Sequence, residues 1–337
     1  MTGADRGSGG GAVCLRDGVE IHLDSGETVV CDARRPDGDV AVVSHAHGDH
    51  LYREPPAAAC WSATTRALAG VRREDAALPE RLDHPRIELL EAGHVPGSRA
   101  ALIEGEDRTY LYTGDVSTRD RLYLEGFDPP SADVLVLEAT YGEPGFEFPP
   151  VAETRAAFED WLARNAARPV VVFGYALGRA QEIEVMLEAA GRDRVLVSDA
   201  IADVDDALDP HLPVTLPGER YDRDDLDLGA GDALVLPSAT ANRDWTDRLV
   251  EATNAATAGM SGWAVDSSYR YANGYDETFV LSDHCDFPEL VALVEAVDPA
   301  SVYTQHGSAE SLARHLTREC GYPATALVAN QRSLSEF

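Results

Sequence analysis

The chain has 337 residues, enough for one large domain or two medium domains with a substantial core. Hydrophobic residues make up 44% of it, as in ordinary globular proteins, and no apolar run approaches the ~20 residues that a membrane-spanning helix needs. The formal net charge is -31, from 59 Asp and Glu against 28 Lys and Arg, which in ordinary salt argues against nucleic acid as a partner.

The charge pattern points to a particular solvent. Every basic residue is arginine, and the acidic residues are spread along the chain with a denser patch at residues 203–232. A protein built for a basic partner would instead concentrate its acids in one tail. At molar salt the Debye length falls to roughly 3 Å, so self-repulsion is screened and a nucleic-acid partner is no longer excluded. We therefore expect a protein from the cytosol of a halophile, an archaeon.

The termini and cysteines fit a cytoplasmic protein. Residues 1–11 are rich in Gly and Ser and lack the apolar stretch of a signal peptide. The five cysteines show no C-x-x-C pairing, so we expect reduced and mostly buried thiols.

The first predicted strands lead into a dense cluster of metal-binding residue types. Alternation predicts strands at residues 19–23 and 28–31, the second closed by Asp32. The apolar run 40–43 predicts a buried strand. It is followed by the stretch Ser-His-Ala-His-Gly-Asp-His, which contains His45, His47, Asp49 and His50. Imidazole nitrogens and carboxylate oxygens are ligands that zinc prefers, so this stretch predicts a metal site.

Further candidate ligands follow later strands. His94 lies between glycine and proline just after the strand at 87–90, and Asp115 follows the strand at 109–112. Glu138 follows the strand at 134–137. Because these residues recur at strand ends, we expect them to meet at one edge of a sheet and to form an active site.

Residues 150–283 change character, because helical and strand patterns alternate there as in a βαβ unit. A helix is predicted at 151–167, followed by a strand at 170–173 and a helix that opens at Gly178 and Arg179 and runs to about residue 190. Strand-like runs lie at 195–197 and 233–236. We interpret this part as a second domain inserted into the first.

The chain then returns to the first domain. A strand at 279–281 ends in Ser282 and His284, and a helix follows at 287–297. A strand at 301–305 ends in His306, before a last helix at 308–319.

These motifs resemble the β-CASP nucleases of the metallo-β-lactamase superfamily. The resemblance lies in His-x-His-x-Asp-His, Leu-Glu-Ala-Thr-Tyr-Gly, Tyr-Ala-Leu-Gly-Arg-Ala-Gln-Glu, Leu-Ser-Asp-His-Cys-Asp and Gln-His-Gly, and it covers nearly the whole chain. It implies an α/β protein: a metallo-β-lactamase αββα sandwich with an inserted β-CASP α/β cap domain. The corresponding domains are residues 1–148 and 279–337 for the sandwich and 149–278 for the cap.

The resemblance also implies roles for individual residues. Two zinc ions, for which manganese could substitute, would be held by a set that includes Asp115 in both sites: His45, His47, His94 and Asp115 for the first, and Asp49, His50, His306 and Asp115 for the second. The predicted catalytic residues are His284 as general acid, Glu138 as the carboxylate that holds and charges it, and Asp49. Asp32 would brace the metal loop, and for Asp32 a turn-forming role is an equal alternative. The predicted substrate-binding residues are Ser98, Ser282, Gly178 and Arg179, and for Arg179 a surface salt bridge is an equal alternative.

The implied activity is hydrolysis of phosphodiester bonds by an activated hydroxide. Within the family the chain is most similar to the exonucleases associated with DNA ligases, which favours DNA as substrate and a ligase as a repair partner. Histidine at position 306 is commoner among RNA enzymes, so an RNA-processing nuclease is the alternative. A small-molecule metallohydrolase would need neither the cap nor Glu138 with His284, and a protein that only binds nucleic acid would have lost ligands. A homodimer would be compatible with the sequence, and no membrane contact is expected.

Overall fold

The structure is a computed structural model, and it describes residues 13–73, 77–222 and 227–328. The first sheet has the strand order β1-β2-β3-β4. Its strands are β1 (Val13–Leu15), β2 (Val19–His22), β3 (Thr28–Cys31) and β4 (Val40–Val42). β1, β2 and β3 are antiparallel neighbours, whereas β3 and β4 are parallel. A small pair of strands, β5 (Ala58–Ala59) and β6 (Glu80–Arg81), lies beside helix α1 (Ala63–Arg72).

The second sheet has the order β18-β17-β10-β9-β8-β7 and joins segments from both ends of the chain. Its strands are β7 (Ile87–Glu91), β8 (Arg99–Glu104), β9 (Thr109–Tyr112), β10 (Val134–Glu138), β17 (Ser301–Gln305) and β18 (Ala324–Ala326). β9, β10 and β17 are parallel neighbours. Their carboxyl ends therefore meet at one edge of this sheet, whereas β4, which precedes His45 and was expected at the same edge, belongs to the first sheet.

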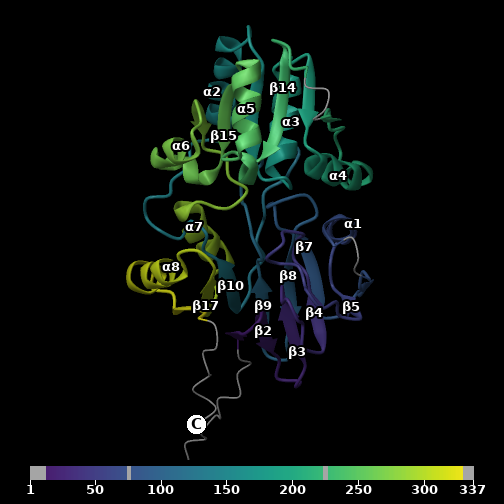
Figure 1. Ribbon diagram of the computed structural model, residues 1–337. Coiled ribbons are helices and arrows are strands. Elements are labelled where there is room, and N and C mark those ends of the chain that lie inside the picture. The colour runs from purple at the N-terminus through teal and green to yellow at the C-terminus, as the bar shows by residue number, and fades with distance from the viewer. Residues whose placement is uncertain (1–12, 74–76, 223–226, 329–337) are drawn as a thin grey trace, which may run out of the picture.

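The two sheets pack face to face between helices. Alternating side chains such as Ile21 and Val29 from the first sheet and Ile103 and Tyr112 from the second share one buried cluster. The far face of the second sheet is covered by α7 (Phe287–Val297) and by α8 (Ala309–His315), which continues as a π-helical turn at Leu316–Cys320. With α1 outside the first sheet, this is the predicted αββα sandwich (Figure 1).

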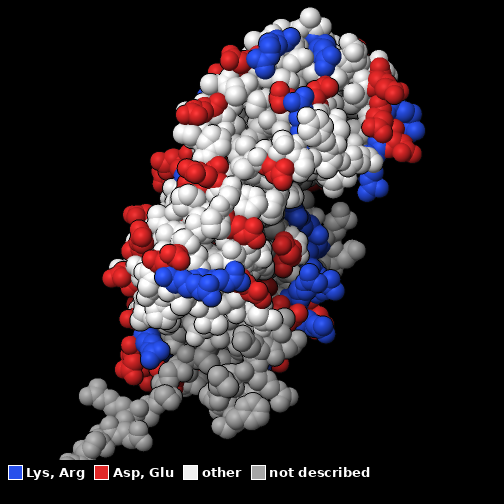
Figure 2. Space-filling view, turned by 90° about the vertical axis from the view of Figure 1, so that its left-hand side faces the viewer, with Lys and Arg blue, Asp and Glu red and all other residues white. Residues whose placement is uncertain are grey.

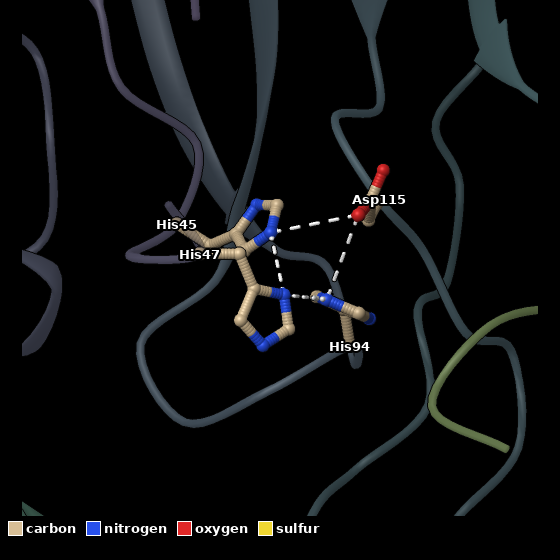
Figure 3. A group of neighbouring side chains, drawn as sticks. All are labelled: His45, His47, His94 and Asp115. Atoms are coloured by element: carbon tan, nitrogen blue, oxygen red, sulfur yellow. Dashed lines mark hydrogen bonds and ion pairs between the residues drawn. The ribbon is translucent and has the colours of Figure 1, made fainter. Parts of the chain in front are cut away.

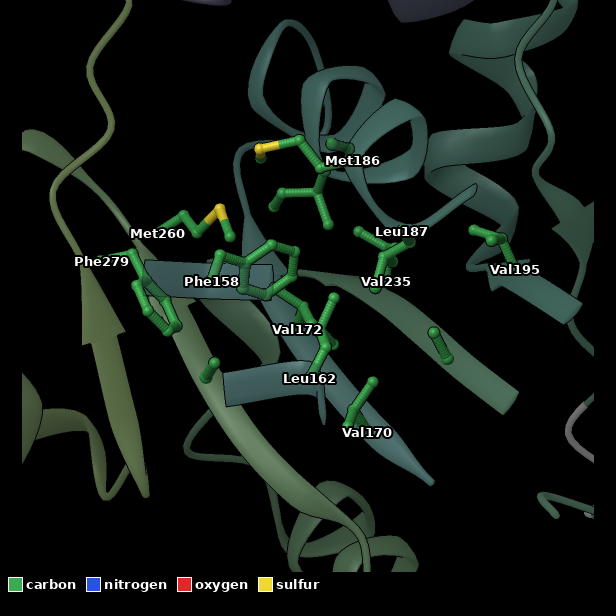
Figure 4. Close-up of a cluster of buried hydrophobic side chains, with 14 of the residues drawn as sticks. Phe158, Leu162, Val170, Val172, Met186, Leu187, Val195, Val235, Met260 and Phe279 are labelled. Carbon is green, nitrogen blue, oxygen red and sulfur yellow. The ribbon is translucent and has the colours of Figure 1, made fainter. Parts of the chain in front are cut away.

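The inserted segment forms a parallel sheet of order β13-β12-β14-β11-β15-β16. Its strands are β11 (Val170–Gly174), β12 (Arg194–Val197), β13 (Glu219–Arg220), β14 (Asp232–Pro237), β15 (Ala256–Met260) and β16 (Glu277–Phe279). Its helices are α2 (Val151–Arg164), α3 (Arg179–Ala189), α4 (Asp199–Leu208), α5 (Asp244–Thr253) and α6 (Ser268–Asn273). Side chains of α2 and α3, among them Phe158 and Leu187, cover one face of this sheet (Figure 4). Leu249 of α5 packs against the other face.

The inserted segment rests on the loops of the sandwich through a mixed apolar cluster. Ala46 and Val95, each next to a predicted metal ligand, pack there with Leu177 of the insert. Val204 and Leu208 of α4 complete the contact against α1. In Figure 1 the insert lies above the sandwich.

The structure corrects several predicted elements. Residues 279–281 were expected to form a strand of the sandwich, but β16 ends at Phe279 and pairs with β15 inside the insert. A short apolar run does not reveal which sheet it joins. The helix expected at 151–167 ends at Arg164, and the helix expected at 308–319 is divided between α8 and the π-turn. The domain boundaries at 148/149 and 278/279 stay predictions.

Two further sequence expectations concern the surface. Among the described helices, none has both the length and the apolar character to cross a bilayer. The face shown in Figure 2 carries acidic side chains over both the insert and the sandwich, interleaved with arginines. This face therefore agrees with the spread of acidic residues read from the sequence.

Candidate metal centre and active site

Four predicted ligands converge where the strands end. His45 and His47 lie on the loop after β4, His94 follows β7 and Asp115 follows β9. Nδ1 of His47 lies 3.1 Å from Nε2 of His45 and 3.1 Å from Nε2 of His94. Oδ2 of Asp115 lies 3.5 Å from Nε2 of His45 and 3.7 Å from Nε2 of His94. Figure 3 shows all four side chains pointing toward one common point.

This arrangement fits a tetrahedral metal ion. Zinc–nitrogen and zinc–oxygen bonds of about 2.0–2.1 Å place the ligand atoms of a tetrahedron roughly 3.3 Å apart. The four separations, from 3.1 to 3.7 Å, bracket that value. Three imidazoles and a carboxylate also match the ligand types of a borderline divalent ion. The donor set therefore fits a divalent metal.

Hydrogen bonds on the opposite ring nitrogens orient these imidazoles. Nδ1 of His94 lies 2.8 Å from the carbonyl oxygen of Asp283, and Nε2 of His47 lies 3.3 Å from the carbonyl oxygen of Leu177. A carbonyl can only accept, so these nitrogens carry the protons and the converging nitrogens keep their lone pairs. Nδ1 of His45 contacts Oγ of Ser44 at 2.9 Å. Because the Ser44 hydroxyl donates to Asp32, it accepts from His45. Such outer contacts hold metal-binding histidines in position.

The electrostatics keep the same histidines neutral. Burial lowers the pKa of His94 to about 3, with a further contribution from the nearby His284 charge. Burial also lowers the pKa of His45 and of His47, and the charges of neighbouring histidines lower both pKa values further. Neutral imidazole is the form that binds a metal.

Asp32 forms the brace expected from its position. Its φ is +50°, and its carboxylate accepts hydrogen bonds from the Ser44 amide at 2.7 Å, the Ser44 hydroxyl at 2.5 Å and the Tyr112 hydroxyl at 2.8 Å. Its Oδ2 also lies 2.8 Å from Nδ1 of His50. Nε2 of His50 is thereby directed toward Asp115, 3.4 Å away. Burial opposes a charge on His50, but the two carboxylates raise its pKa.

The second predicted metal set is only partly assembled. His50 and Asp115 are adjacent, but the Asp49 side chain is 69% exposed and its Oδ2 lies 3.9 Å from Nε2 of His50. The His306 ring centre lies 5.3 Å from that of His50, on a backbone with φ of +59°. Among the described residues, Asp49 and His306 join no group of three potential ligands. Both residues line the cavity. Because the Asp49 side chain is mostly exposed, it would have to turn inward to complete a second metal site.

The predicted acid and its carboxylate are in contact. Nδ1 of His284 lies 2.7 Å from Oε1 of Glu138, which is the last residue of β10 and is fully buried. The amides of Val116 and Thr140 donate to the same carboxylate at 3.3 and 2.8 Å. Burial works against a charged His284, yet Glu138 raises the pKa of His284 to about 9. His284 is therefore protonated near neutral pH.

These groups share one cavity of about 470 Å³ between the sandwich and the insert. Its polar wall includes His47, His50, Asp115 and His284. The remaining lining residues are Gly48, Asp49, Arg72, Thr140, Tyr141, Tyr175, Ala176, Arg179, Ser261, Gly262, Trp263, Asp283, His306 and Gly307. The cavity thus combines potential metal ligands with the rings of Tyr141, Tyr175 and Trp263.

Aromatic side chains at this cavity were not identified from the sequence as functional. Tyr175 is 54% exposed and Trp263 is 41% exposed, although both line the cavity. The Trp263 ring centre lies 4.8 Å from that of Tyr141, which itself lies 6.0 Å from that of His284. The Ser-Gly-Trp stretch was a detectable signal, but its place beside His284 depends on the tertiary structure.

The predicted substrate-binding residues have mainly structural contacts. The Ser98 hydroxyl accepts from the Val95 amide at 3.2 Å, and the Ser282 hydroxyl accepts from the His284 amide at 3.0 Å. The Gly178 amide donates to the Gln181 side chain at 2.7 Å, so it is not available to a phosphate. Gly178 has φ of +90°, and a Cβ there would lie 2.5 Å from Val95. Substrate contact by these residues stays a prediction.

Arg179 belongs to a buried ionic network, which replaces the surface salt bridge considered above. Its guanidinium lies 2.9 Å from Oδ1 of Asp283. Burial alone would raise the pKa of Asp283, but Arg179 holds it well below its usual range. Arg121, which the sequence did not single out, pairs with Glu182 of α3 at 2.9 Å and donates to the His94 carbonyl at 2.6 Å. The network thus connects the insert to the loop that carries His94.

No family model matches the chain. Over 297 residues it is 32% identical to a protein of Opitutus terrae named probable DNA ligase, covering 85% of this chain and 28% of that protein. It is 29% identical over 192 residues to ribonuclease TTHA0252 of Thermus thermophilus, covering 45% of this chain and 43% of that one. The chain thus spans less than half the length of these two curated relatives.

Other relatives include an RNase J-like protein of Methanocaldococcus jannaschii, 28% identical over half of each chain. A crystal structure of a protein of unknown function from Enterococcus faecalis superposes with a TM-score of 0.63 and 15% identity, covering 96% of this chain and 97% of that chain. The structural likeness supports the arrangement of sandwich and insert across the whole chain.

Proposed function

The chain belongs to the β-CASP family of the metallo-β-lactamase superfamily, and on this basis we propose that it is a metal-dependent nuclease that hydrolyses phosphodiester bonds. The observation that carries this proposal is the placement of two devices on one cavity. The His45–His47–His94–Asp115 cluster and the His284–Glu138 pair both border it. A metal site beside a protonated histidine is the equipment for phosphoryl transfer to water.

The metal ions would be held by the residues already described. His45, His47, His94 and Asp115 would hold the first, and His50, Asp115, Asp49 and His306 the second. Divalent ions bound there supply Lewis acidity toward the phosphate oxygens and lower the pKa of water. The nitrogen-rich donor set favours zinc, and manganese is compatible with the same residues.

The chain's own residues account for the proton given to the leaving group. His284 directs Nδ1 at Glu138, which leaves Nε2 as its other proton donor. With a pKa of about 9 it carries this proton at neutral pH and gives it to the departing oxygen. The Glu138 carboxylate is held beside the His284 imidazole, because backbone amides from two loops donate hydrogen bonds to it.

We propose that the substrate is DNA and that the protein acts on it as an exonuclease. The relative aligned over 85% of this chain is named a probable DNA ligase. The aligned region is only 28% of that protein, so most of the relative lies outside the part that resembles this chain. This pattern supports a role in DNA repair beside a ligase. RNA is the second candidate, because several other relatives are named ribonucleases.

The surroundings proposed for this activity follow from composition. A net charge of -31 without lysine supports the cytoplasm of a halophilic archaeon. At high salt, local contacts to the substrate would outweigh long-range attraction. Dimerisation is compatible with this proposal and is not needed to complete the cavity described above.

The test uses purified wild type and His284→Ala in ~2 M KCl with zinc, the high salt being chosen to screen self-repulsion. Each is given matched single-stranded DNA and RNA, labelled at either end. Exposed His211 provides the matched control, His211→Ala. We expect stepwise shortening of DNA by wild type and by the control, and a loss of about 10²–10⁴-fold in the His284 variant.

The outcomes separate the alternatives. Preferential cutting of RNA would keep the site and change the substrate. Release of internal fragments would show an endonuclease. If neither strand is cut by protein that has bound zinc, the nuclease proposal is wrong, and binding without hydrolysis becomes the better description.

A further inference from the structure

A second group of potential metal ligands lies in the first sheet, outside the cavity. Sγ of Cys14 lies 3.6 Å from Nε2 of His22 and 3.8 Å from Oε2 of Glu20. Nε2 of His22 lies 3.2 Å from the same Glu20 oxygen. None of the three residues lines the cavity of the proposed nuclease.

The strand register explains why these side chains meet. Cys14 of the edge strand β1 lies directly opposite Glu20 of β2, and His22 follows two residues later on the same face. The residues between them, Val19 and Ile21, point into the core between the sheets. The group therefore occupies the outer face of the sheet.

The distances match the edges of a zinc tetrahedron. With a zinc–sulfur bond of about 2.3 Å and bonds of about 2.0–2.1 Å to nitrogen and oxygen, the sulfur should lie roughly 3.5 Å from each of the other ligand atoms. The nitrogen and oxygen should lie roughly 3.3 Å apart. The observed separations of 3.6, 3.8 and 3.2 Å agree with this pattern.

Two contacts prepare the group further. Nδ1 of His22 lies 3.1 Å from Oγ1 of Thr28, and a proton donated there leaves the Nε2 lone pair directed at Cys14 and Glu20. The Glu20 side chain is only 10% exposed, so its carboxylate is held in place. Arg16, which is 59% exposed, lies 3.3 Å from the same Glu20 oxygen and competes with any cation.

We propose that Cys14, Glu20 and His22 form a separate zinc site with three protein ligands. Binding forms a zinc–sulfur bond, and the thiol proton passes to the buffer. The thiolate and carboxylate balance the double charge of the ion, while the imidazole binds as a neutral ligand. The ion would join the edge strand β1 to β2. A thiolate with an imidazole distinguishes this site chemically from the sulfur-free centre in the cavity.

The first experiment measures metal content and cobalt spectra of the full chain. Wild type, Cys14→Ser and His22→Gln are compared with Cys320→Ser, whose cysteine is also partly exposed. We expect the first two variants to bind one zinc ion fewer per chain and to lose the near-ultraviolet band of a cobalt–thiolate bond. The Cys320 control should keep both. Equal zinc content and an unchanged band in Cys14→Ser would overturn the proposal.

The second experiment uses thiol alkylation, read by mass spectrometry peptide by peptide. Zinc should slow modification of Cys14 by at least tenfold and leave Cys320 unchanged. Removing the competing cation in Arg16→Gln should tighten zinc binding at this site. Cys14 modification at the same rate with and without zinc would contradict the site, whatever nuclease assays show. The two proposals therefore fail independently.

Discussion

Glu138 and His284 are 146 positions apart in the chain, yet Oε1 of one lies 2.7 Å from Nδ1 of the other. The carboxylate ends a strand of the sandwich, whereas the imidazole lies on the segment that leaves the insert. The backbone of this same segment accepts the hydrogen bond from His94 through Asp283. The proposed proton donor and a predicted metal ligand are thus positioned by one stretch of chain.

Glu138→Gln should slow hydrolysis by roughly 10²-fold at neutral pH and leave metal content unchanged. The amide can still accept a hydrogen bond from His284, but it no longer stabilises the imidazolium, so less of the general acid is available. Single-turnover rates and zinc analysis would measure this. The nearby exposed Glu143 supplies the control, Glu143→Gln. A wild-type rate in Glu138→Gln would remove the carboxylate from the mechanism.

Asp32→Asn should weaken zinc binding by roughly 10–100-fold, the usual effect of losing an outer contact to a ligand histidine. The amide NH₂ would face Nδ1–H of His50, two donors in contact, and the alternative histidine tautomer would place a proton on the metal-binding nitrogen. Competition with a chelator measures the affinity. Exposed Asp39, immediately before β4, gives the matched control, Asp39→Asn. Equal affinities in the two variants would contradict the brace.

Trp263→Ala and Tyr175→Ala should each raise the KM for single-stranded substrate with a smaller change in kcat. Stacking on an exposed aromatic ring contributes about 1–3 kcal/mol per base, which corresponds to a loss of affinity of roughly 5- to 160-fold. Tyr271, which is 80% exposed and does not line the cavity, provides the control Tyr271→Ala. An abasic strand should show little difference among the variants. Equal losses on abasic and normal strands would exclude stacking.

The Glu184–Asp205 pair should make the protein less stable as pH rises. Burial, then Asp205, raises the pKa of Glu184 to about 9, and burial raises the pKa of Asp205 to about 6. A carboxyl whose pKa is higher in the folded than in the unfolded protein stabilises the fold fully below the unfolded pKa, which is about 4.5 for Glu184. This stabilisation is lost progressively as the pH rises from about 4.5 to about 9.

Denaturation at several pH values tests this expectation. In Glu184→Gln the free energy of unfolding should fall less steeply between pH 5 and pH 9 than in wild type, a range taken from the shifted pKa of Glu184. Glu188→Gln, on the exposed side of the same helix, should behave as wild type. An identical slope in all three proteins would show that Glu184 is ionised without cost.

Salt should stabilise the fold. With a net charge of -31, raising KCl from ~0.1 M to ~2 M shortens the Debye length from about 10 Å to below 3 Å and screens repulsion between acidic side chains. The thermal midpoint should therefore rise over this range, whereas a neutral osmolyte of equal osmolality should have less effect. A midpoint that does not respond to KCl would contradict a halophilic origin.

The extent to which sequence predicted structure varied with the kind of signal. Runs of large apolar residues correctly predicted β10, β11 and β17, because β-branched and leucine side chains fill sheet cores. β15 was missed, since its Ala-Thr-Ala-Gly-Met sequence has little bulk although every residue is buried. α4 was also missed, because Asp205 interrupts its apolar face.

The candidate site shows the same division. His45, His47 and His50 were singled out because they are clustered in sequence, and His94 and Asp115 because they follow strands; the structure brings them together, and their role as ligands stays a prediction. The cavity aromatics Tyr141, Tyr175 and Trp263, and Arg121, could not be assigned to the site from the sequence. Their relation to the predicted metal centre arises from contacts between the sandwich and the insert. Asp49 was predicted as a ligand from its motif, but motif membership does not determine a side-chain rotamer.

The contact between the Leu177 carbonyl and Nε2 of His47 has a consequence for how such proteins can evolve or be engineered. A backbone atom of the insert selects which nitrogen of a predicted ligand histidine is free, so the insert is more than a cover that could be exchanged at will. A chimera carrying a relative's insert would keep its metal only if the graft returned a carbonyl to this place. Deleting the insert should cost metal affinity before it changes any choice of substrate.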